Sequence, residues 1–298
     1  MNRRTLLASA FAASFIPALP FTSALAQQGS SIMTAPASSG FAPVNGVEVY
    51  YATYGSGEPL VLLHGGLGQI EMFGALIDRF AATRTVIGID LQAHGRTPAM
   101  ARPMSFAAMA TDVAGIIRHL GYERADIVGY SMGGGVALTL GLDHPEVVDR
   151  LVVLSAPFAY AGWHNYNRDG MRAISSALTE QMKPSPMYQM FAAVNPDPER
   201  NFPILLDKMG AFIGNDYDYS GRIPSLAAPT MLVYGDWDAV RTAHVAQFFE
   251  LLGGGRQDAL WDGSGMNRNR LAILPSVTHY TMLEAPGLAE IVLRFLTR

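Results

Sequence analysis

A sharp turn between an apolar strand and a helix constrains this fold more than any other feature of the chain. The apolar run at 125–128 leads into the pentapeptide G-Y-S-M-G at 129–133, and apolar residues recur at helical spacing from Val136 onward. Glycines lie two positions before and after Ser131, where their small size lets the strand and helix backbones approach closely. A glycine-rich turn without chemistry also fits the pentapeptide, so the other motifs must decide between the two interpretations.

The first 26 residues have the order of an export signal. Arg3 and Arg4 precede an apolar stretch that ends in an A-x-A pattern before Gln27. This order predicts a cleaved secretory signal peptide at 1–26, and the arginine pair favours the twin-arginine route. We therefore expect a periplasmic or secreted protein without stable membrane insertion after cleavage, with a retained N-terminal anchor as the alternative. Residues 27–40 are rich in Ser, Gln, Gly and Ala and are expected to form a flexible lead-in.

Composition limits the classes of partner and site. Only 15% of the 298 residues are charged, the net charge is −4 and no long basic run is present, so nucleic acid is not an expected partner. The chain has no cysteine, which excludes a disulfide and a thiolate nucleophile. No H-E-x-x-H spacing predicts a metal site, and the glycine run at 133–135 lacks the Lys-Ser/Thr of a phosphate loop. We expect neither a metal nor a cofactor, and the sequence leaves the oligomeric state open.

Apolar runs and helical patterns alternate along most of the chain. The apolar runs predict strands at 47–54, 59–63, 85–90, 125–128, 151–154, 229–234 and 271–274. Such alternation predicts an α/β fold with a mostly parallel central sheet covered by helices on both faces. The alternation breaks at 157–225, which is rich in Met, Phe, Tyr and Trp and carries helical patterns. We expect an inserted helical cap there and a core built from 41–156 and 226–298.

Polar residues follow several of the predicted strands. In open parallel sheets the ligand site lies beyond the carboxyl ends of the strands. Ser131, an aspartate at 236 or 238, and His279 all follow such ends. A serine hydroxyl needs a base to take its proton, a histidine can do so near neutral pH, and a carboxylate can orient the imidazole. The pattern therefore favours nucleophilic catalysis by Ser131.

Together these motifs resemble those of the α/β-hydrolase superfamily, over about residues 41–298. The motifs that carry the resemblance are His64-Gly65-Gly66, Asp90 with His94-Gly95-Arg96-Thr97, Gly129-Tyr130-Ser131-Met132-Gly133, Gly235-x-x-Asp238, and His279 with Glu284-Ala285-Pro286. The superfamily has its triad in the order Ser, Asp, His, which implies Ser131, Asp238 and His279 here, with Asp236 as the alternative acid. The resemblance also implies that the N–H groups of Met132 and Gly66 stabilise an oxyanion, with Leu67 as the alternative to Gly66.

The resemblance implies a serine hydrolase that cleaves a small-molecule carboxylic ester or lactone through an acyl-enzyme, and the predicted signal peptide makes it an exported one. The expected substrate-binding residues are Leu67, Tyr130, Trp163 and Tyr280. C–C bond hydrolases, enol-lactonases, aminopeptidases and perhydrolases keep the same triad and remain alternatives, as does a small-molecule sensor that retains it. Epoxide hydrolases and haloalkane dehalogenases are similar but need an aspartate where this chain has Ser131.

Three other histidines and one long loop are expected to have roles outside the chemistry. We expect His64 to brace the turn after the strand at 59–63, His94 to pack beneath the turn after Asp90, and His244 to lie on a helix surface. Residues 253–270 make a longer excursion than a helix-to-strand link needs, and we expect a lid edge or a packing loop there.

Overall fold

The computed structural model describes residues 34–297. The predicted signal peptide and the first residues of the predicted lead-in lie outside this range. From Thr34 onward the chain forms one compact unit, which includes both the predicted core and the predicted cap.

Strand β1 (Ser38–Val44) begins inside the predicted lead-in. It pairs antiparallel with β2 (Val47–Tyr54) from its first residue, and the hydroxyls of Ser38 and Thr53 are 2.8 Å apart. The expectation of a flexible segment is therefore wrong for 38–40, because a ladder with β2 holds small residues that no hydrophobic pattern marks as a strand. Asn45 and Gly46 form the hairpin turn between the two strands, with positive φ at both residues, 51° and 75°.

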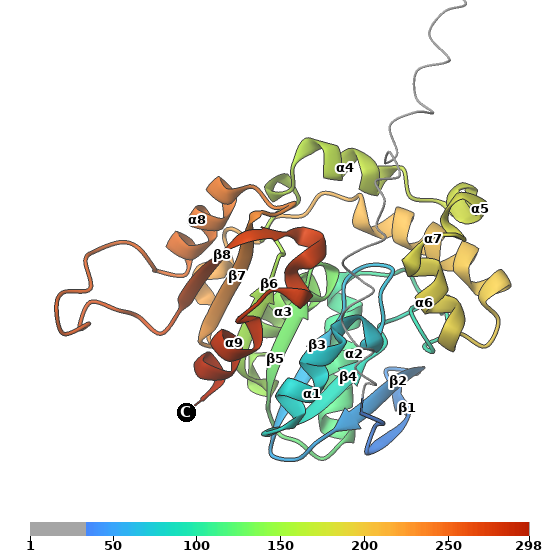
Figure 1. The fold of residues 1–298 in the computed structure, drawn as a ribbon, viewed down its shortest axis with the longest axis horizontal. Coiled ribbons are helices and arrows are strands. Elements are labelled where there is room, and N and C mark those ends of the chain that lie inside the picture. The colour runs from blue at the N-terminus through green and yellow to red at the C-terminus, as the bar shows by residue number, and fades with distance from the viewer. Residues whose placement is uncertain (1–33, 298) are drawn as a thin grey trace, which may run out of the picture. The chain divides into compact units, whose positions relative to one another are not determined.

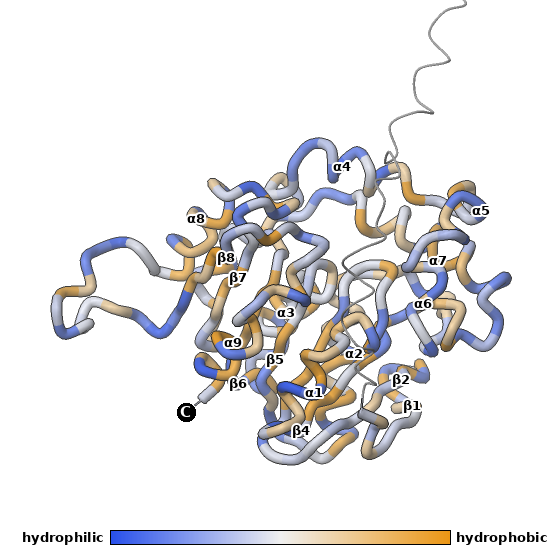
Figure 2. The backbone as a smooth tube through the Cα atoms, in the orientation of Figure 1, coloured by the Kyte–Doolittle hydropathy of each residue, from blue (hydrophilic) through white to orange (hydrophobic). Residues whose placement is uncertain are grey.

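An eight-stranded sheet, in the order β1-β2-β4-β3-β5-β6-β7-β8, forms the centre of the fold (Figure 1). The remaining strands are β3 (Glu58–Leu63), β4 (Arg84–Ile89), β5 (Ala125–Tyr130), β6 (Val148–Leu154), β7 (Thr230–Trp237) and β8 (Arg270–Thr278). These six pair in parallel, and only the pairings of β2 are antiparallel. The central strands are apolar (Figure 2). Strand β5 is buried throughout and β6 over most of its length, as expected for a sheet covered on both faces.

Helices cover both faces of the sheet (Figure 1). The core helices and 3₁₀ turns are η1 (Ile70–Phe73), α1 (Ala75–Ala81), α2 (Phe106–His119), α3 (Met132–Asp143), η2 (Pro145–Val147), α8 (Thr242–Leu251), η6 (His279–Glu284) and α9 (Leu288–Leu296). Helix α1 packs against α9, whereas α2 packs against α3 on the opposite face. Ser105 caps the N-terminus of α2, since its side chain accepts a hydrogen bond from the Ala108 N–H. The α/β class and the mostly parallel sheet are thus as predicted.

The segment between β6 and β7 is helical. It contains η3 (Tyr160–Gly162), α4 (Asn165–Arg172), η4 (Ser176–Leu178), α5 (Thr179–Met182), α6 (Pro186–Val194), α7 (Pro198–Ile213) and η5 (Ile223–Ser225). The apolar face of α7 is buried, whereas α4 buries no residue and is hydrophilic (Figure 2). The Asn195 side chain donates a 2.6 Å hydrogen bond to the Gly95 carbonyl, which ties this segment to the loop after β4.

Residues between α8 and β8 extend away from the sheet (Figure 1). Their exposed apolar side chains include Leu260, Trp261 and Met266. Strand β8 continues beyond the predicted 271–274 as far as Thr278, with a positive φ of 61° at Ser276. No helix in residues 34–297 combines the length and apolar character that a membrane span needs.

Candidate active site

Ser131 lies at the junction of β5 and α3 in a strained conformation. Its φ is 53° and its ψ is −116°, a left-handed region that residues other than glycine rarely adopt. A Cβ atom at Gly129 would lie 2.2 Å from the Gly133 oxygen, and one at Gly133 would lie 2.1 Å from the Leu63 oxygen. The requirement for glycine on both sides of Ser131 is therefore confirmed, and the turn presents the serine at the carboxyl end of the sheet.

His279 connects Ser131 with Asp238. It begins η6 directly after β8, and its Nε2 is 3.1 Å from Oγ of Ser131. Its Nδ1 is 3.0 Å from Oδ1 of Asp238. Because a carboxylate can only accept, the proton of the neutral ring belongs on Nδ1, which leaves Nε2 free to accept from the serine hydroxyl. The three side chains thus form one continuous hydrogen-bonded chain.

Asp238, and not Asp236, contacts the histidine. Asp238 is 7% exposed. Burial acts to raise the pKa of its carboxyl, but hydrogen bonds from His279 and Ser155 outweigh burial and hold the pKa below its ordinary value. Asp236 is exposed, and its carboxylate accepts from the Val277 N–H at 3.2 Å. Geometry therefore favours the predicted acid over its alternative.

Ser155 is a member of this cluster that the sequence analysis missed. It follows β6 directly, is fully buried, and its Oγ donates a 2.5 Å hydrogen bond to Oδ2 of Asp238. The signal that finds Ser131 and His279, a polar residue just after a predicted parallel strand, also applies to Ser155, which follows the run at 151–154.

The loop after β3 passes next to the serine, since a Cβ atom at Gly65 would lie 3.4 Å from Cβ of Ser131. Among residues 34–297, neither the Gly66 N–H nor the Met132 N–H has a hydrogen-bond acceptor. The Leu67 N–H, in contrast, donates to Nε2 of His94 at 3.1 Å. That bond removes Leu67 as the alternative donor and leaves the amides of Gly66 and Met132 available for an oxyanion.

Neutral, buried histidines hold this loop in place. Nε2 of His64 accepts from the Leu91 N–H at 3.0 Å, and Nε2 of His94 accepts from the Leu67 N–H. Each ring must therefore carry its proton on Nδ1, which donates to a nearby backbone carbonyl at 2.7 and 2.9 Å. Burial lowers the pKa of His64 to about 4 and that of His94 to about 3. The bracing role expected for His64 and the buried position expected for His94 are confirmed.

Three of the four residues expected to bind substrate have rings close to that of His279. Tyr130 is buried, and its hydroxyl donates to the His279 carbonyl at 2.7 Å. Trp163 is buried with its ring centroid 5.5 Å from that of His279. Tyr280, 76% exposed, lies at the same centroid distance on an open side. Leu67 is nearly buried with a positive φ of 59°. Substrate contact by these four residues stays a prediction.

A family model described as alpha/beta hydrolase fold matches residues 58–269. This chain belongs to the alpha/beta hydrolase fold family. Over 113 residues, or 38% of its length, it is 37% identical to the soluble epoxide hydrolase of Corynebacterium sp. (strain C12), of which the match covers 40%. A putative esterase/lipase of Haemophilus influenzae is 32% identical over 42% of this chain and 45% of that protein. The chain therefore spans about two fifths of the length of these curated relatives.

A solved structure of an N-acyl homoserine lactone degrading enzyme, Est816, is also similar to this alpha/beta hydrolase. The two share 26% sequence identity and superpose with a TM-score of 0.60, over 85% of this chain and 98% of the other. The family membership and the shared fold agree with the resemblance carried by the sequence motifs.

Helix α7 covers the loop that carries the candidate oxyanion donor of this hydrolase. A Cβ atom at Gly66 would lie 2.8 Å from the methyl group of Met209 and 3.6 Å from Ile213. Met209 itself is 1% exposed. The helical segment therefore presents apolar side chains over the Gly66 loop, a contact that no sequence pattern identifies because it joins distant segments.

The expected surface position of His244 is wrong. His244 is 5% exposed, and its ring stacks on that of Phe158 at a centroid distance of 3.9 Å. Burial, and secondarily the positive charge of Arg241, lowers its pKa to about 4. Within residues 34–297 its Nε2 has no hydrogen-bond partner. The chain after β6 folds over the start of α8, and a helical pattern read alone cannot reveal that cover.

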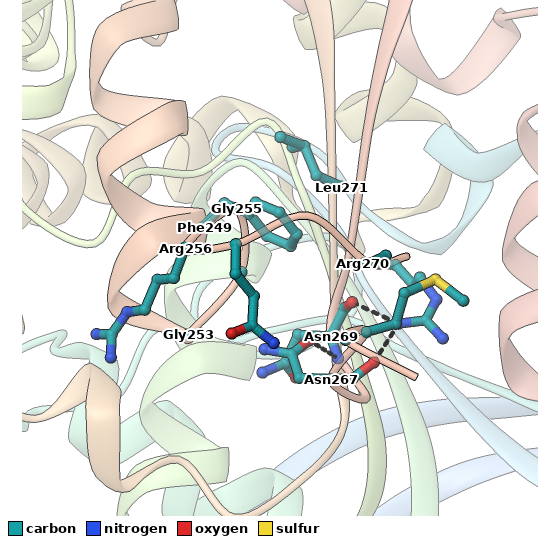
Figure 3. A pocket seen from close by; sticks show the side chains of 13 residues that line it. Phe249, Gly253, Gly255, Arg256, Asn267, Asn269, Arg270 and Leu271 are labelled. Atoms are coloured by element: carbon teal, nitrogen blue, oxygen red, sulfur yellow. Dashed lines mark hydrogen bonds between the residues drawn. The ribbon is translucent and has the colours of Figure 1, made fainter. Parts of the chain in front are cut away.

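The excursion at 253–270 does not line the site. It forms a cavity of about 420 Å³ together with Phe249 and Leu271 (Figure 3). Arg270 donates to the backbone carbonyls of Asn267 and Asn269 at 2.5 and 2.7 Å beside it. This loop precedes β8, whereas Ser131 follows β5, so in a parallel sheet the two lie at opposite ends of the strands. Of the two expectations, the packing loop fits and the lid edge does not.

Proposed function

We propose that this alpha/beta hydrolase is a serine hydrolase that cleaves a carboxylic ester or lactone. The observation that carries the proposal is the continuous chain of hydrogen bonds from Asp238 through His279 to Ser131, with distances of 3.0 and 3.1 Å. Such a chain activates a serine that is a poor nucleophile on its own.

The first half-reaction forms the acyl-enzyme. Oγ of Ser131 attacks the ester carbonyl carbon while Nε2 of His279 takes the hydroxyl proton, and the buried Asp238 stabilises the imidazolium. The Gly66 and Met132 N–H groups, which have no other acceptor, bind the oxyanion of the tetrahedral intermediate. The intermediate collapses when His279 returns the proton to the departing alkoxide oxygen, which breaks the C–O bond.

The second half-reaction releases the acid. A water molecule gives one proton to Nε2 of His279 and attacks the acyl carbon. The resulting intermediate expels Oγ of Ser131, which takes the proton back. With an ester the products are an acid and an alcohol, and with a lactone they are the two ends of one hydroxy acid.

Several features favour ester or lactone substrates over the epoxides of one curated relative. Position 131 is a serine, whereas the epoxide hydrolases that this chain resembles need an aspartate there. Est816, the solved structure that shares 26% sequence identity with this chain, is an N-acyl homoserine lactone degrading enzyme. Met209 and Ile213 give the site an apolar wall, which suits an acyl chain.

Turnover of p-nitrophenyl esters of graded chain length and of simple lactones tests the proposal. Wild type should hydrolyse at least one class, and Ser131→Ala should lose that activity by a factor of about 10⁴ or more. Equal activity in both proteins would rule out Ser131 as the nucleophile.

We further propose that residues 1–26 direct export to the periplasm or outside the cell. The paired arginines Arg3 and Arg4 ahead of the apolar run support this. Replacing both with lysine should abolish periplasmic recovery of the full chain if export uses the twin-arginine route. Unchanged recovery would support the general secretory route instead.

A further inference from the structure

Ser155 is a buried hydroxyl next to the proposed triad that the proposed mechanism does not use. Its Oγ donates to Oδ2 of Asp238 at 2.5 Å, while Oδ1 of the same carboxylate lies 3.0 Å from Nδ1 of His279. Oδ2 thus accepts from the serine hydroxyl and, at 3.3 Å, from the Gly235 N–H, whereas Oδ1 binds the imidazole and accepts from the Val240 N–H at 3.1 Å. Ser155 is 0% exposed, so water does not compete for this bond.

The backbone of Ser155 is held in a strained conformation. Its φ is 53°, a left-handed conformation that is unfavourable for residues other than glycine. Its N–H donates to the Val233 carbonyl in β7 at 3.0 Å, which ties it to the strand that leads into Asp238. Glycine would relieve the strain but would also remove the hydroxyl. The strain is therefore consistent with a role for this side chain.

We propose that Ser155 is a positioning residue of the hydrolytic site, which orients the Asp238 carboxylate toward His279 and reduces its basicity. The inference rests on the proposed function. A hydrogen bond to a carboxylate favours its charged form. Without that bond Oδ2 keeps the longer 3.3 Å bond from the Gly235 N–H, so the carboxylate is held less firmly and becomes a stronger base. It then holds the imidazolium more tightly and makes it a poorer acid toward the leaving group.

Other titratable groups near Asp238 do not obscure this effect. Tyr130 approaches from the end of β5, Tyr234 from β7 and Tyr280 from η6, and burial raises the pKa of all three. These phenols therefore stay neutral near neutral pH. His279 is bonded directly to Asp238, so a change at Ser155 should reach the acidic limb of the pH–rate profile through the histidine.

The experiment measures kcat and the pH dependence of kcat/KM for a turned-over ester with wild type, Ser155→Ala and Ser155→Cys. Ser276→Ala is the matched control, because Ser276 is also a serine at positive φ, 61°, but is exposed. Ser155→Ala should lower kcat about tenfold. It should also move the acidic limb of the kcat/KM profile to higher pH by about half a pH unit. Ser155→Cys should lie between it and wild type, since a thiol is a weak donor. Ser276→Ala should match wild type.

Two results would overturn the inference. One is a folded Ser155→Ala with the kcat and acidic limb of wild type. The other is a loss of activity with an unmoved limb, which would make Ser155 a packing residue. If Ser155→Ala does not fold, the kcat and the acidic limb of Ser155→Cys test the inference by the same criteria. Wild type that neither turns over esters nor reacts with a fluorophosphonate would contradict the proposed function itself, whereas active wild type with unmoved variant profiles contradicts this inference alone.

Discussion

The hydroxyl of Tyr130 donates a 2.7 Å hydrogen bond to the backbone carbonyl of His279, the proposed base. The two residues belong to segments far apart in the chain, one directly before the proposed nucleophile and the other directly after β8. This bond fixes the backbone from which the imidazole reaches Ser131. Tyr130→Phe should therefore lower kcat by about fivefold to tenfold and destabilise the protein by about 1–2 kcal/mol, measured by ester hydrolysis and urea unfolding. Tyr51→Phe, in β2, is the control and should leave kcat unchanged.

Substitution of the two neighbouring aspartates separates the proposed triad acid from its alternative. Asp238→Asn should lower kcat by about 10³–10⁴ because the amide no longer fixes the histidine tautomer. Asp236→Asn removes only an exposed carboxylate that binds the Val277 N–H at 3.2 Å, and its kcat should stay close to wild type. Steady-state kinetics on one ester checks both, and the opposite order of effects would move the acid to position 236.

Gly133, two residues after the proposed nucleophile, should tolerate no side chain. In Gly133→Ala the new Cβ would lie 2.1 Å from the Leu63 backbone oxygen, which cannot move without disturbing β3. We expect a loss of about 3 kcal/mol or more, or a failure to fold. Gly170→Ala in α4 is the control, since nothing lies within 4 Å of its Cβ, and it should gain up to about 1 kcal/mol. Urea unfolding compares the two, and a stable Gly133→Ala would contradict the tight turn.

Neutral buried histidines should make the fold sensitive to acid. Burial lowers the pKa of His244 from its ordinary 6.5 to about 4. Between these values the unfolded chain binds a proton that the folded chain does not, so the free energy of unfolding falls as pH falls. The loss is about 1.4 kcal/mol per pH unit for each such histidine.

The variant His244→Phe isolates the contribution of one histidine to the pH dependence of the free energy of unfolding. Phenylalanine keeps the stack on Phe158 and removes the unpartnered Nε2, so unfolding free energies measured between pH 6.5 and 4 should fall less steeply than in wild type. His164→Ala is the control, because His164 is exposed and its loss should leave the slope unchanged. A His244→Phe slope equal to that of wild type would show that the histidine titrates alike in both states.

Much of the fold and the site followed from local sequence signals. The apolar runs at 59–63 and 151–154 predicted buried parallel strands, because a strand covered on both faces needs continuous apolar sequence. Ser131 and His279 were found because parallel strands bring their carboxyl ends to one edge of the sheet. Asp238 came from the family pattern, and the structure brings its carboxylate to the histidine.

The remaining features depend on contacts between distant segments. Residues 38–40 join the sheet through ladder bonds to β2, and their small side chains carry no strand pattern. His244 is buried by the chain that follows β6, and Met209 reaches Gly66 from α7. Ser155 obeys the strand-end rule, but a single serine after a strand does not stand out until the distance to Asp238 is known.

Covalent labelling of the intact protein with a fluorophosphonate tests the central claim most directly. The reagent phosphonylates only a serine that a neighbouring base has activated, and mass spectrometry of the intact chain and of its peptides locates the adduct. We predict a single adduct on Ser131 in wild type, a much slower reaction in Asp238→Asn and no adduct in Ser131→Ala. Wild type without an adduct, or an adduct that persists in Ser131→Ala, would contradict the assignment of Ser131 as the nucleophile.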